Sequence, residues 1–147
     1  LIGGEDGIAK EIVLNALKNK KNVVTANKAL VSSNWSKLNK IAKKNNCNLK
    51  YEAAVAGGIP IIKVINEFLS SNKITRVYGI LNGTSNFILS NMFSLGKDYK
   101  KVLSEAQSLG YAEADPKFDI DGTDTAHKLS ILSSLAFDFS NDSLQVV

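Results

Sequence analysis

The chain has 147 residues, of which 44% are hydrophobic and 22% are charged, a composition typical of one soluble globular unit rather than of a disordered or fibrous chain. Charges interrupt its apolar runs well before the roughly 18 residues that a membrane-crossing helix requires, and its first residues lack the basic-then-apolar pattern of a secretory signal. A cytoplasmic location is the default expectation.

The excess of basic residues raises the question of nucleic-acid binding. The formal net charge is +4 and the isoelectric point is near 9.1. Lys37, Lys40 and Lys44 recur at helical spacing opposite apolar positions, and no aromatic residues alternate with them as stacking platforms for bases would. We interpret these lysines as the solvated face of a helix and expect no nucleic-acid partner.

Cysteine and histidine usage gives no sign of a structural cross-link. The single cysteine, Cys47, cannot form an internal disulfide, and the single histidine, His127, lies too far along the chain for a metal-ligand pattern. Cys47 is therefore expected to be chemically inert.

In chain order, residues 1–4 (LIGG) are typical of the end of a buried strand, and the GGEDG stretch predicts a turn into a helix. Because the sequence opens inside a strand, the chain is expected to start within a larger domain. The apolar positions predicted for the first helix are Ile8, Ile12, Leu14 and Leu17.

Two further strands are predicted, at residues 22–25 (NVVT) and 49–55. Between them, Ser33 or Asn34 can cap a helix that continues to about Asn45. Strands therefore alternate with helices, which favours an α/β fold.

The pair Gly57–Gly58 is the expected seam between two domains, residues 1–58 and 59–147. A helix is predicted directly after it, with Pro60 near its start, where the missing N–H costs nothing. The apolar stripe of this helix comprises Ile61, Val64, Ile65, Phe68 and Leu69.

The second half of the chain is predicted to hold a strand at residues 72–81, a turn at 82–84 into a helix, and a further helix at 99–109. Residues 121–123 are expected to open the last long helix. The apolar faces of the first and last of these helices comprise Phe87, Ile88 and Met92, and Leu129, Leu132 and Ala136.

Several familiar ligand motifs are missing. The ten glycines never take the i, i+2, i+5 spacing of a dinucleotide fingerprint, and neither a Walker A sequence nor HExxH occurs. The DIDG stretch resembles the middle of an EF-hand loop, but loop positions one and twelve would be Lys117 and Lys128. Calcium requires carboxylates there, so a site of that kind is not expected.

Residues 110–128 gather carboxylates in an otherwise basic chain. Asp124 and Lys128 stand four residues apart and so share a helix face; from spacing alone, an exposed ion pair is the simpler interpretation. Because other carboxylates are close in sequence, a proton-transfer lysine positioned by acids is the alternative, since nearby carboxylates favour the ammonium form and burial favours the amine. The acidic residues are Glu113, Asp115, Asp119, Asp121 and Asp124.

Three other positions are candidates. Lys28 follows a predicted strand, where open α/β sheets place ligand-binding groups, although an ordinary surface lysine also fits. Glu52 stands at a strand end before glycines that could turn carbonyl groups toward a cation, with a plain hinge as the alternative. Asn82, Gly83 and Thr84 either only cap a helix or present N–H groups to an anionic substrate.

Five ordered strings resemble homoserine dehydrogenase: LIGG, NVVTANKALVS, YEAAVAGGIPIIKVINEFL, GILNGTSNFIL and LGYAEADPKFDIDGTDTAHKLSILSSLAF. They cover nearly all of residues 1–139. The resemblance implies an oxidoreductase that interconverts L-homoserine and L-aspartate 4-semialdehyde with NAD(P)(H), in threonine and methionine biosynthesis. It also implies the fold: the end of a Rossmann-type nucleotide-binding domain at residues 1–58, then an α/β catalytic and dimerisation domain with a mixed sheet at 59–147.

The same resemblance implies roles for individual residues. Lys128 is the expected proton donor and acceptor at the substrate oxygen, with Asp124 as its partner. Glu113 and Asp119 are expected to hold the amino group or hydroxyl of the substrate. The remaining implied site residues are Lys28 between nicotinamide and substrate, Thr84 for substrate, Gly110 beside the cofactor, and Glu52, Val55, Gly57 and Ile59 for a monovalent cation such as Na⁺ or K⁺.

The family pattern extends beyond both ends of the sequence. An internal fragment is therefore expected, inactive alone and without NADPH binding of its own, from a protein that is a homodimer at full length. Two alternatives stay open: another semialdehyde or hydroxy-acid dehydrogenase with the same two-domain plan, and a non-catalytic module that binds an amino acid or a cation.

Overall fold

The computed structural model describes residues 2–138. The described residues divide into two compact units: the first unit holds residues 2–77 and 127–138, and the second unit holds residues 78–126. Helices predominate over one small sheet, and the α/β class expected from the sequence is confirmed. The elements are α1 (Ile8–Lys18), β1 (Val23–Val24), α2 (Lys28–Ser33), α3 (Trp35–Lys44), β2 (Leu49–Lys50), the 3₁₀ turn η1 (Glu52–Ala54), α4 (Ile61–Lys63), the π-helical turn η2 (Val64–Phe68), α5 (Gly83–Leu95), α6 (Tyr99–Ser108), α7 (Lys117–Ile120) and α8 (Thr123–Phe137).

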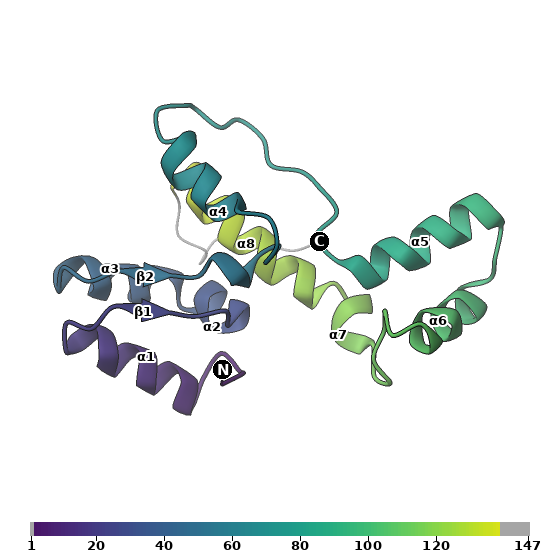
Figure 1. Cartoon of the computed structure of the whole chain (residues 1–147), viewed down its shortest axis with the longest axis horizontal. Coiled ribbons are helices and arrows are strands. Elements are labelled where there is room, and N and C mark those ends of the chain that lie inside the picture. The colour runs from purple at the N-terminus through teal and green to yellow at the C-terminus, as the bar shows by residue number, and fades with distance from the viewer. Residues whose placement is uncertain (1, 139–147) are drawn as a thin grey trace. The chain divides into compact units, whose positions relative to one another are not determined.

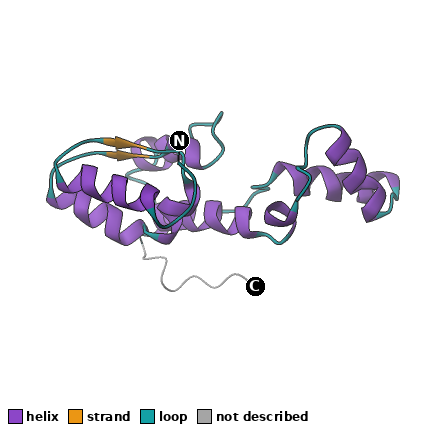
Figure 2. Cartoon of the chain, turned by 90° about the horizontal axis from the view of Figure 1, so that it is seen from below, coloured by secondary structure: helices purple, strands orange, loops and turns teal. Residues whose placement is uncertain are grey.

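The first unit is built on a parallel strand pair. Val23 of β1 pairs with Leu49 of β2, and the chain crosses between the strands through α2 and α3. Helices α1 and α3 contact each other and contact β1 and β2 respectively, and the strands lie side by side (Figures 1 and 2). Parallel strands need such a helical crossover, so the alternation read from the sequence corresponds to a β–α–β unit.

Apolar side chains from α1, α2 and α3 form the core under this strand pair. Leu17 and Leu38 have no exposed surface, and Cys47 packs against the same cluster. The cluster consists of Val13, Leu14, Leu17, Leu30, Leu38 and Ala42. On the opposite side of α3, Lys37, Lys40 and Lys44 are exposed, which confirms the predicted solvated face.

The predicted apolar face of α1 is wrong by one position at its start. Ile8 and Ile12 are 66% and 52% exposed, whereas Ala9 and Val13 are buried. Because α1 packs on both α3 and β1, the stripe that reaches the core begins at Ala9, where a small side chain permits close approach. Tertiary packing, rather than hydrophobicity alone, selects which residues are buried.

Three strand predictions need correction. Residues 2–4 form no strand, and Leu1 lies outside the described residues. The strand predicted at 49–55 ends at Lys50, because the chain then turns through η1. The strand predicted at 72–81 is not formed: among the described residues, β1 and β2 pair only with each other, and a strand without a hydrogen-bonded neighbour leaves its backbone groups unpaired.

The helix predicted after Pro60 is present but irregular. Three residues of α4 continue into η2, in which the N–H of Leu69 donates to the carbonyl of Val64 at 2.9 Å, an i to i+5 bond. This wider turn shifts the side chains out of the 3.6-residue period. Ile65 is therefore buried, while Phe68, predicted on the same stripe, is 70% exposed.

The second unit is a pair of helices with a short third helix beside them. Helices α5 and α6 pack against each other around a core of Ile88, Val102, Ala106 and Ala112. Gly96, with φ of 61°, ends α5 in a left-handed conformation, which glycine adopts without a steric penalty. Both helices match the sequence predictions, whereas α7 was not predicted.

Helix α8 begins at Thr123 as expected. The Asp121 carboxylate accepts a hydrogen bond from the Thr123 N–H at 3.0 Å, and hydrogen bonds from Thr123 hold the pKa of this carboxyl below its ordinary value. No helix within residues 2–138 is long and apolar enough to cross a bilayer.

Candidate active site

Two aspartates of the second unit meet on one amide group. Asn82 precedes α5, and its side-chain oxygen accepts a hydrogen bond from the Ser85 N–H at 2.8 Å. Its Nδ2 donates to Asp119 Oδ1 at 2.8 Å and to Asp124 Oδ2 at 2.9 Å. A helix-capping residue thus joins the carboxylate that ends α7 to the carboxylate that begins α8.

Asp119 is held by two further side chains of α5. The Thr84 hydroxyl lies 3.1 Å from Asp119 Oδ2 and 2.6 Å from the carbonyl oxygen of Tyr111, so its single proton serves two acceptors. The Ser85 hydroxyl donates to the Asp119 carbonyl at 3.0 Å. The first turn of α5 therefore fixes both the backbone and the side chain of Asp119.

The polar side chains of this hydrogen-bonded network are unusually buried. Asp124 is 3% exposed, Asn82 5% and Thr84 7%, while Asp119 is half-buried. Carboxylates are seldom buried unless hydrogen-bonded or paired with a positive group. The arrangement is suited to presenting fixed negative oxygen atoms to a small cationic ligand.

Other predicted residues of this unit lie in the loop after α6. Gly110 adopts φ of 77°, a conformation that lets the chain leave the helix, and its N–H donates to the Gln107 carbonyl at 3.1 Å. The side chain of Glu113 is exposed, and its backbone carbonyl accepts a hydrogen bond from the Gln107 side chain at 3.2 Å. The structure brings Thr84, Asp119 and Asp124 together but does not add the Glu113 carboxylate to that network.

The two predicted lysines belong to the first unit. Lys128 lies in α8, four residues after Asp124, and is half-buried. Lys28 is half-buried as well and is the first residue of α2, directly after the strand-to-helix connection that follows β1. This is the edge of a parallel sheet at which α/β proteins bind ligands.

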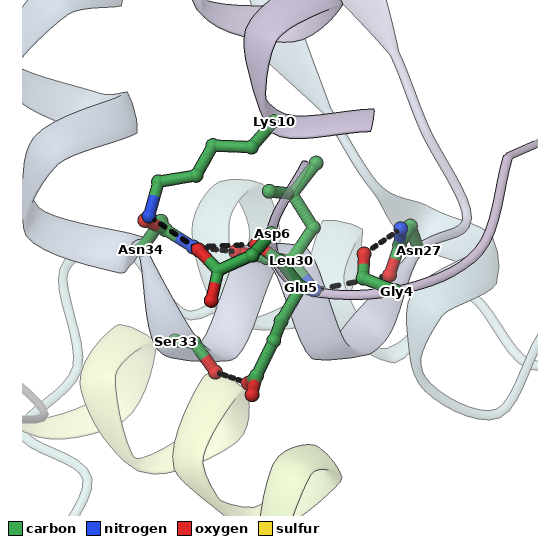
Figure 3. Close-up of polar contacts among 8 residues, drawn as sticks. All are labelled: Gly4, Glu5, Asp6, Lys10, Asn27, Leu30, Ser33 and Asn34. Atoms are coloured by element: carbon green, nitrogen blue, oxygen red, sulfur yellow. Dashed lines mark hydrogen bonds and ion pairs between the residues drawn. The ribbon is translucent and has the colours of Figure 1, made fainter. Parts of the chain in front are cut away.

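Asn27, which precedes Lys28, connects α2 to residues 2–6, the glycine-containing loop before α1, here called the glycine loop (Figure 3). Its Oδ1 accepts a hydrogen bond from the Leu30 N–H at 3.0 Å, and its Nδ2 donates to the carbonyls of Ile2 at 3.0 Å and Gly4 at 2.6 Å. The residue thus caps the helix and clamps the loop at the same time.

The far side of the same loop is held by the end of α2. The Ser33 hydroxyl donates to the Glu5 carboxylate, and the Asn34 side chain donates to the Glu5 carbonyl at 3.2 Å, as Figure 3 shows. Lys10 and Asp6 form an ion pair of 2.7 Å across the loop's exit into α1. Side chains at the two ends of α2 therefore hold Ile2, Gly4 and Glu5, and Lys10 of α1 holds Asp6.

The residues predicted for a cation site lie in one loop, and two of them, Glu52 and Ile59, already accept hydrogen bonds from other residues of the chain. The Glu52 carboxylate accepts from the N–H groups of Ile62 at 3.0 Å and Lys63 at 3.1 Å, so it caps α4. The Ile59 carbonyl accepts from Ile61 N–H at 2.7 Å. Val55 is buried and Gly57 is exposed. A carbonyl oxygen that accepts one hydrogen bond has a second lone pair, with which it could still coordinate a cation.

No three His, Cys, Asp or Glu side chains within residues 2–138 converge as ligands for a metal ion.

Sequence reasoning found the aspartates but missed the amides that hold them and the glycine loop. Asn82 was considered as part of a helix cap or as a source of backbone N–H groups, but not as a donor to the two aspartates, and Asn27 was not considered. The available signal was helix capping: each asparagine stands three residues before the backbone N–H that it caps, at Ser85 and at Leu30.

Two family models together match almost the whole chain. The model described as "Homoserine dehydrogenase, NAD binding domain" matches residues 4–52, and the model described as "Homoserine dehydrogenase" matches residues 60–147. The chain belongs to the homoserine dehydrogenase family. The assignment agrees with the resemblance expected from the sequence motifs.

Individual homoserine dehydrogenases agree closely with this chain. The Neisseria gonorrhoeae enzyme is 56% identical over 93% of the chain. A crystal structure of a homoserine dehydrogenase from Thiobacillus denitrificans superposes with a TM-score of 0.88 at 54% identity, covering 94% of this chain and 32% of that one. A hyperthermophilic archaeal homoserine dehydrogenase in complex with NADPH gives a TM-score of 0.84 at 37% identity, covering 90% of this chain and 41% of that one.

The chain spans about 31% of the length of the N. gonorrhoeae relative and a similar share of the Pseudomonas aeruginosa one. The match is therefore to one continuous part of a homoserine dehydrogenase.

Proposed function

We propose that the protein carrying this chain interconverts L-homoserine and L-aspartate 4-semialdehyde with NAD(P)(H), a step of threonine and methionine biosynthesis. The observation that supports it most directly is the pair Asp119 and Asp124, held on Asn82 within a chain of the homoserine dehydrogenase family. The substrate carries an ammonium group, which fixed carboxylates bind through charge-assisted hydrogen bonds.

The residues of the second unit serve substrate binding in this proposal. Asp119 binds the amino group or hydroxyl of the substrate, since Thr84 and Asn82 hold its carboxylate rigidly. Glu113, on the exposed loop after Gly110, supplies a second acidic contact. A site that is fixed before the substrate arrives loses less entropy when it binds.

Lys128 is the proposed proton donor and acceptor at the substrate oxygen. In the reducing direction negative charge develops on the aldehyde oxygen, which an ammonium group stabilises while it delivers the proton. Asp124 stands one helical turn before Lys128 in α8 and is buried, so it is suited to orienting the lysine.

The first unit places a lysine where a nicotinamide cofactor could bind. Lys28 stands at the carboxyl edge of a parallel β–α–β unit, beside a glycine loop that Asn27 fixes in place. Lys28 and Gly110 are the residues proposed to contact the cofactor. NAD(P)H, when bound, supplies the hydride for the carbonyl carbon.

Further parts of the proposal concern the whole protein. The nucleotide-binding part ends near residue 58 and the catalytic part follows it. A monovalent cation, Na⁺ or K⁺, binds the carbonyls of Glu52, Val55, Gly57 and Ile59. The protein is a cytoplasmic homodimer at full length.

The test is turnover by the full-length protein that contains this sequence, assayed as homoserine-dependent reduction of NAD⁺ and NADP⁺. Lys128→Ala should lower kcat by at least about 100-fold with a much smaller change in KM, because the lost group acts mainly in the transition state. Lys37→Ala, which removes an exposed lysine of α3, is the matched control. Near-normal turnover of Lys128→Ala would reject the assigned role, and an unsubstituted protein that prefers another hydroxy compound would reject the substrate.

A further inference from the structure

The side-chain amide of Asn82 has no remaining hydrogen-bonding capacity on its donor side. A primary amide carries two N–H donors, and both are used, one on Asp119 at 2.8 Å and one on Asp124 at 2.9 Å. Its oxygen accepts the Ser85 N–H at 2.8 Å. Each of the three contacts also connects a different helix, namely α7, α8 and α5.

Few other side chains could make the same three contacts. Aspartate would keep the helix cap but offer no donor to either carboxylate. Serine would supply one donor, and alanine would supply nothing. Glutamine carries the same amide on a side chain that is longer by one methylene group. In this closely packed site, where Asn82 is 5% exposed, the extra length would move the amide away from its three partners.

Holding two carboxylates on one nitrogen has a specific electrostatic consequence. Ionised carboxylates repel each other, and the repulsion is strongest in a buried site where water cannot screen it. Donors placed between them offset that repulsion and fix the direction in which each remaining oxygen lone pair points. Without Asn82, Asp119 would retain the Thr84 hydroxyl, and the spacing of the pair would no longer be set.

We infer that Asn82 is a positioning residue that sets the separation and orientation of Asp119 and Asp124, and thereby the affinity of the site for the ammonium group of the substrate. The inference rests on the proposed function, because it assigns Asp119 to the substrate and Asp124 to Lys128. It assigns Asn82 no contact with substrate or cofactor.

The decisive substitution is Asn82→Asp in the full-length protein. It preserves the size of the side chain and the oxygen that caps α5, but removes both donors and adds a third carboxylate. The expected result is a rise in KM for homoserine of about tenfold or more, from the loss of two hydrogen bonds to charged groups. KM for NADP⁺ should stay within about twofold, since a positioning effect is confined to the substrate side.

Asn86→Asp is the matched control. Asn86 lies one turn further along α5 and is exposed, and its side-chain oxygen accepts a long hydrogen bond from the Ser90 hydroxyl at 3.4 Å. It adds the same charge to the same helix without touching either aspartate, so its kinetic constants should remain within about twofold of the unsubstituted protein. Asn82→Ser, with one donor, should give a KM between those of the unsubstituted protein and Asn82→Asp, and it carries the test if Asn82→Asp fails to fold.

The outcomes separate the inference from the function on which it rests. If the unsubstituted protein does not oxidise homoserine, the proposed function fails. If it does, and folded Asn82→Asp or Asn82→Ser has an unchanged KM for homoserine, the positioning role is overturned. A parallel loss of affinity for homoserine and NADP⁺ would also overturn it, because that pattern indicates general structural damage.

Discussion

Tyr51 shows how burial changes the chemistry of one residue, next to the loop proposed to bind a cation. Its side chain is 6% exposed, and its ring meets Trp35 edge to face at a centroid distance of 5.5 Å. Burial, and secondarily the charge of Glu52, raise the pKa of the Tyr51 hydroxyl well above its ordinary value of 10.0. The fold therefore favours the neutral phenol.

The sign of this shift predicts an alkaline weakness. The unfolded chain releases the Tyr51 proton near pH 10.0, whereas the folded chain retains it. The stabilisation from Tyr51 is thus fully present below that pH and is lost as the pH rises toward the higher folded pKa. Tyr51→Phe should lose less stability than the parent protein between pH 9 and 11, measured by urea denaturation at each pH. An equal loss in both proteins would contradict the prediction.

At the scale of elements, the connection from β1 to α2 both caps α2 and holds the glycine loop. Asn27 caps α2 and binds two carbonyls of the glycine loop, while Ser33 and Asn34 hold Glu5 at the other end of the helix. A helix of six residues is too short to be stable alone. Its contacts with the loop and the core keep Lys28 in a defined place.

Asn27→Ala removes one capping bond and two bonds to the loop, so it should destabilise the protein by about 2 kcal/mol. Amide hydrogen exchange should accelerate at the first turn of α2. Asn19→Ala is the control, because the side chain of Asn19 makes an exposed bond to the Asn15 carbonyl at the end of α1. Equal effects of the two substitutions would argue against the clamp.

Elements whose signals are local were predicted well, and those that depend on distant partners were not. Helices α3, α5, α6 and α8 have apolar periodicity in the sequence, and they occur where expected. The side chains of Asn82 and Asp98 cap α5 and α6, whereas Asn34, a predicted cap of α3, makes no side-chain capping bond. The strand predicted at residues 72–81 has β-branched residues but no neighbour with which to pair among the described residues. The irregular turn η2 has no local signature, so the exposure of Phe68 could not be anticipated.

At the scale of the whole molecule, each compact unit has its own apolar cluster, one around Leu17 and Leu38 and the other around Ile88 and Val102. The family could be predicted from the sequence because its motifs are strings of particular residues, which can be read without knowing the fold. In the candidate site, Asp119, Asp124 and Thr84 were predicted and are connected. The connecting side chain was missed, because no sequence pattern shows which donors a fold will place between two carboxylates.

Separate clusters predict separate local responses. Leu38→Ala should cost about 2–5 kcal/mol, since Leu38 is fully buried, and should raise hydrogen exchange in α1 and α3 more than in α5 and α6. Val102→Ala, at the core of the second unit, should produce the opposite pattern. Hydrogen exchange followed by mass spectrometry would distinguish them, and identical exchange maps for the two variants would contradict the prediction.

Asn82 is followed by Gly83, the dipeptide in which the next backbone nitrogen most readily attacks the carbonyl carbon of the side-chain amide. The attack expels ammonia and forms a succinimide, which water then opens to aspartate or isoaspartate. In the folded chain, the three hydrogen bonds of that amide and the helical backbone of Gly83 oppose the attack. Chemical ageing at this bond should therefore proceed mainly through unfolded molecules. The aspartate product is identical to Asn82→Asp, so molecules that refold after the reaction would have the weaker substrate binding expected of that variant.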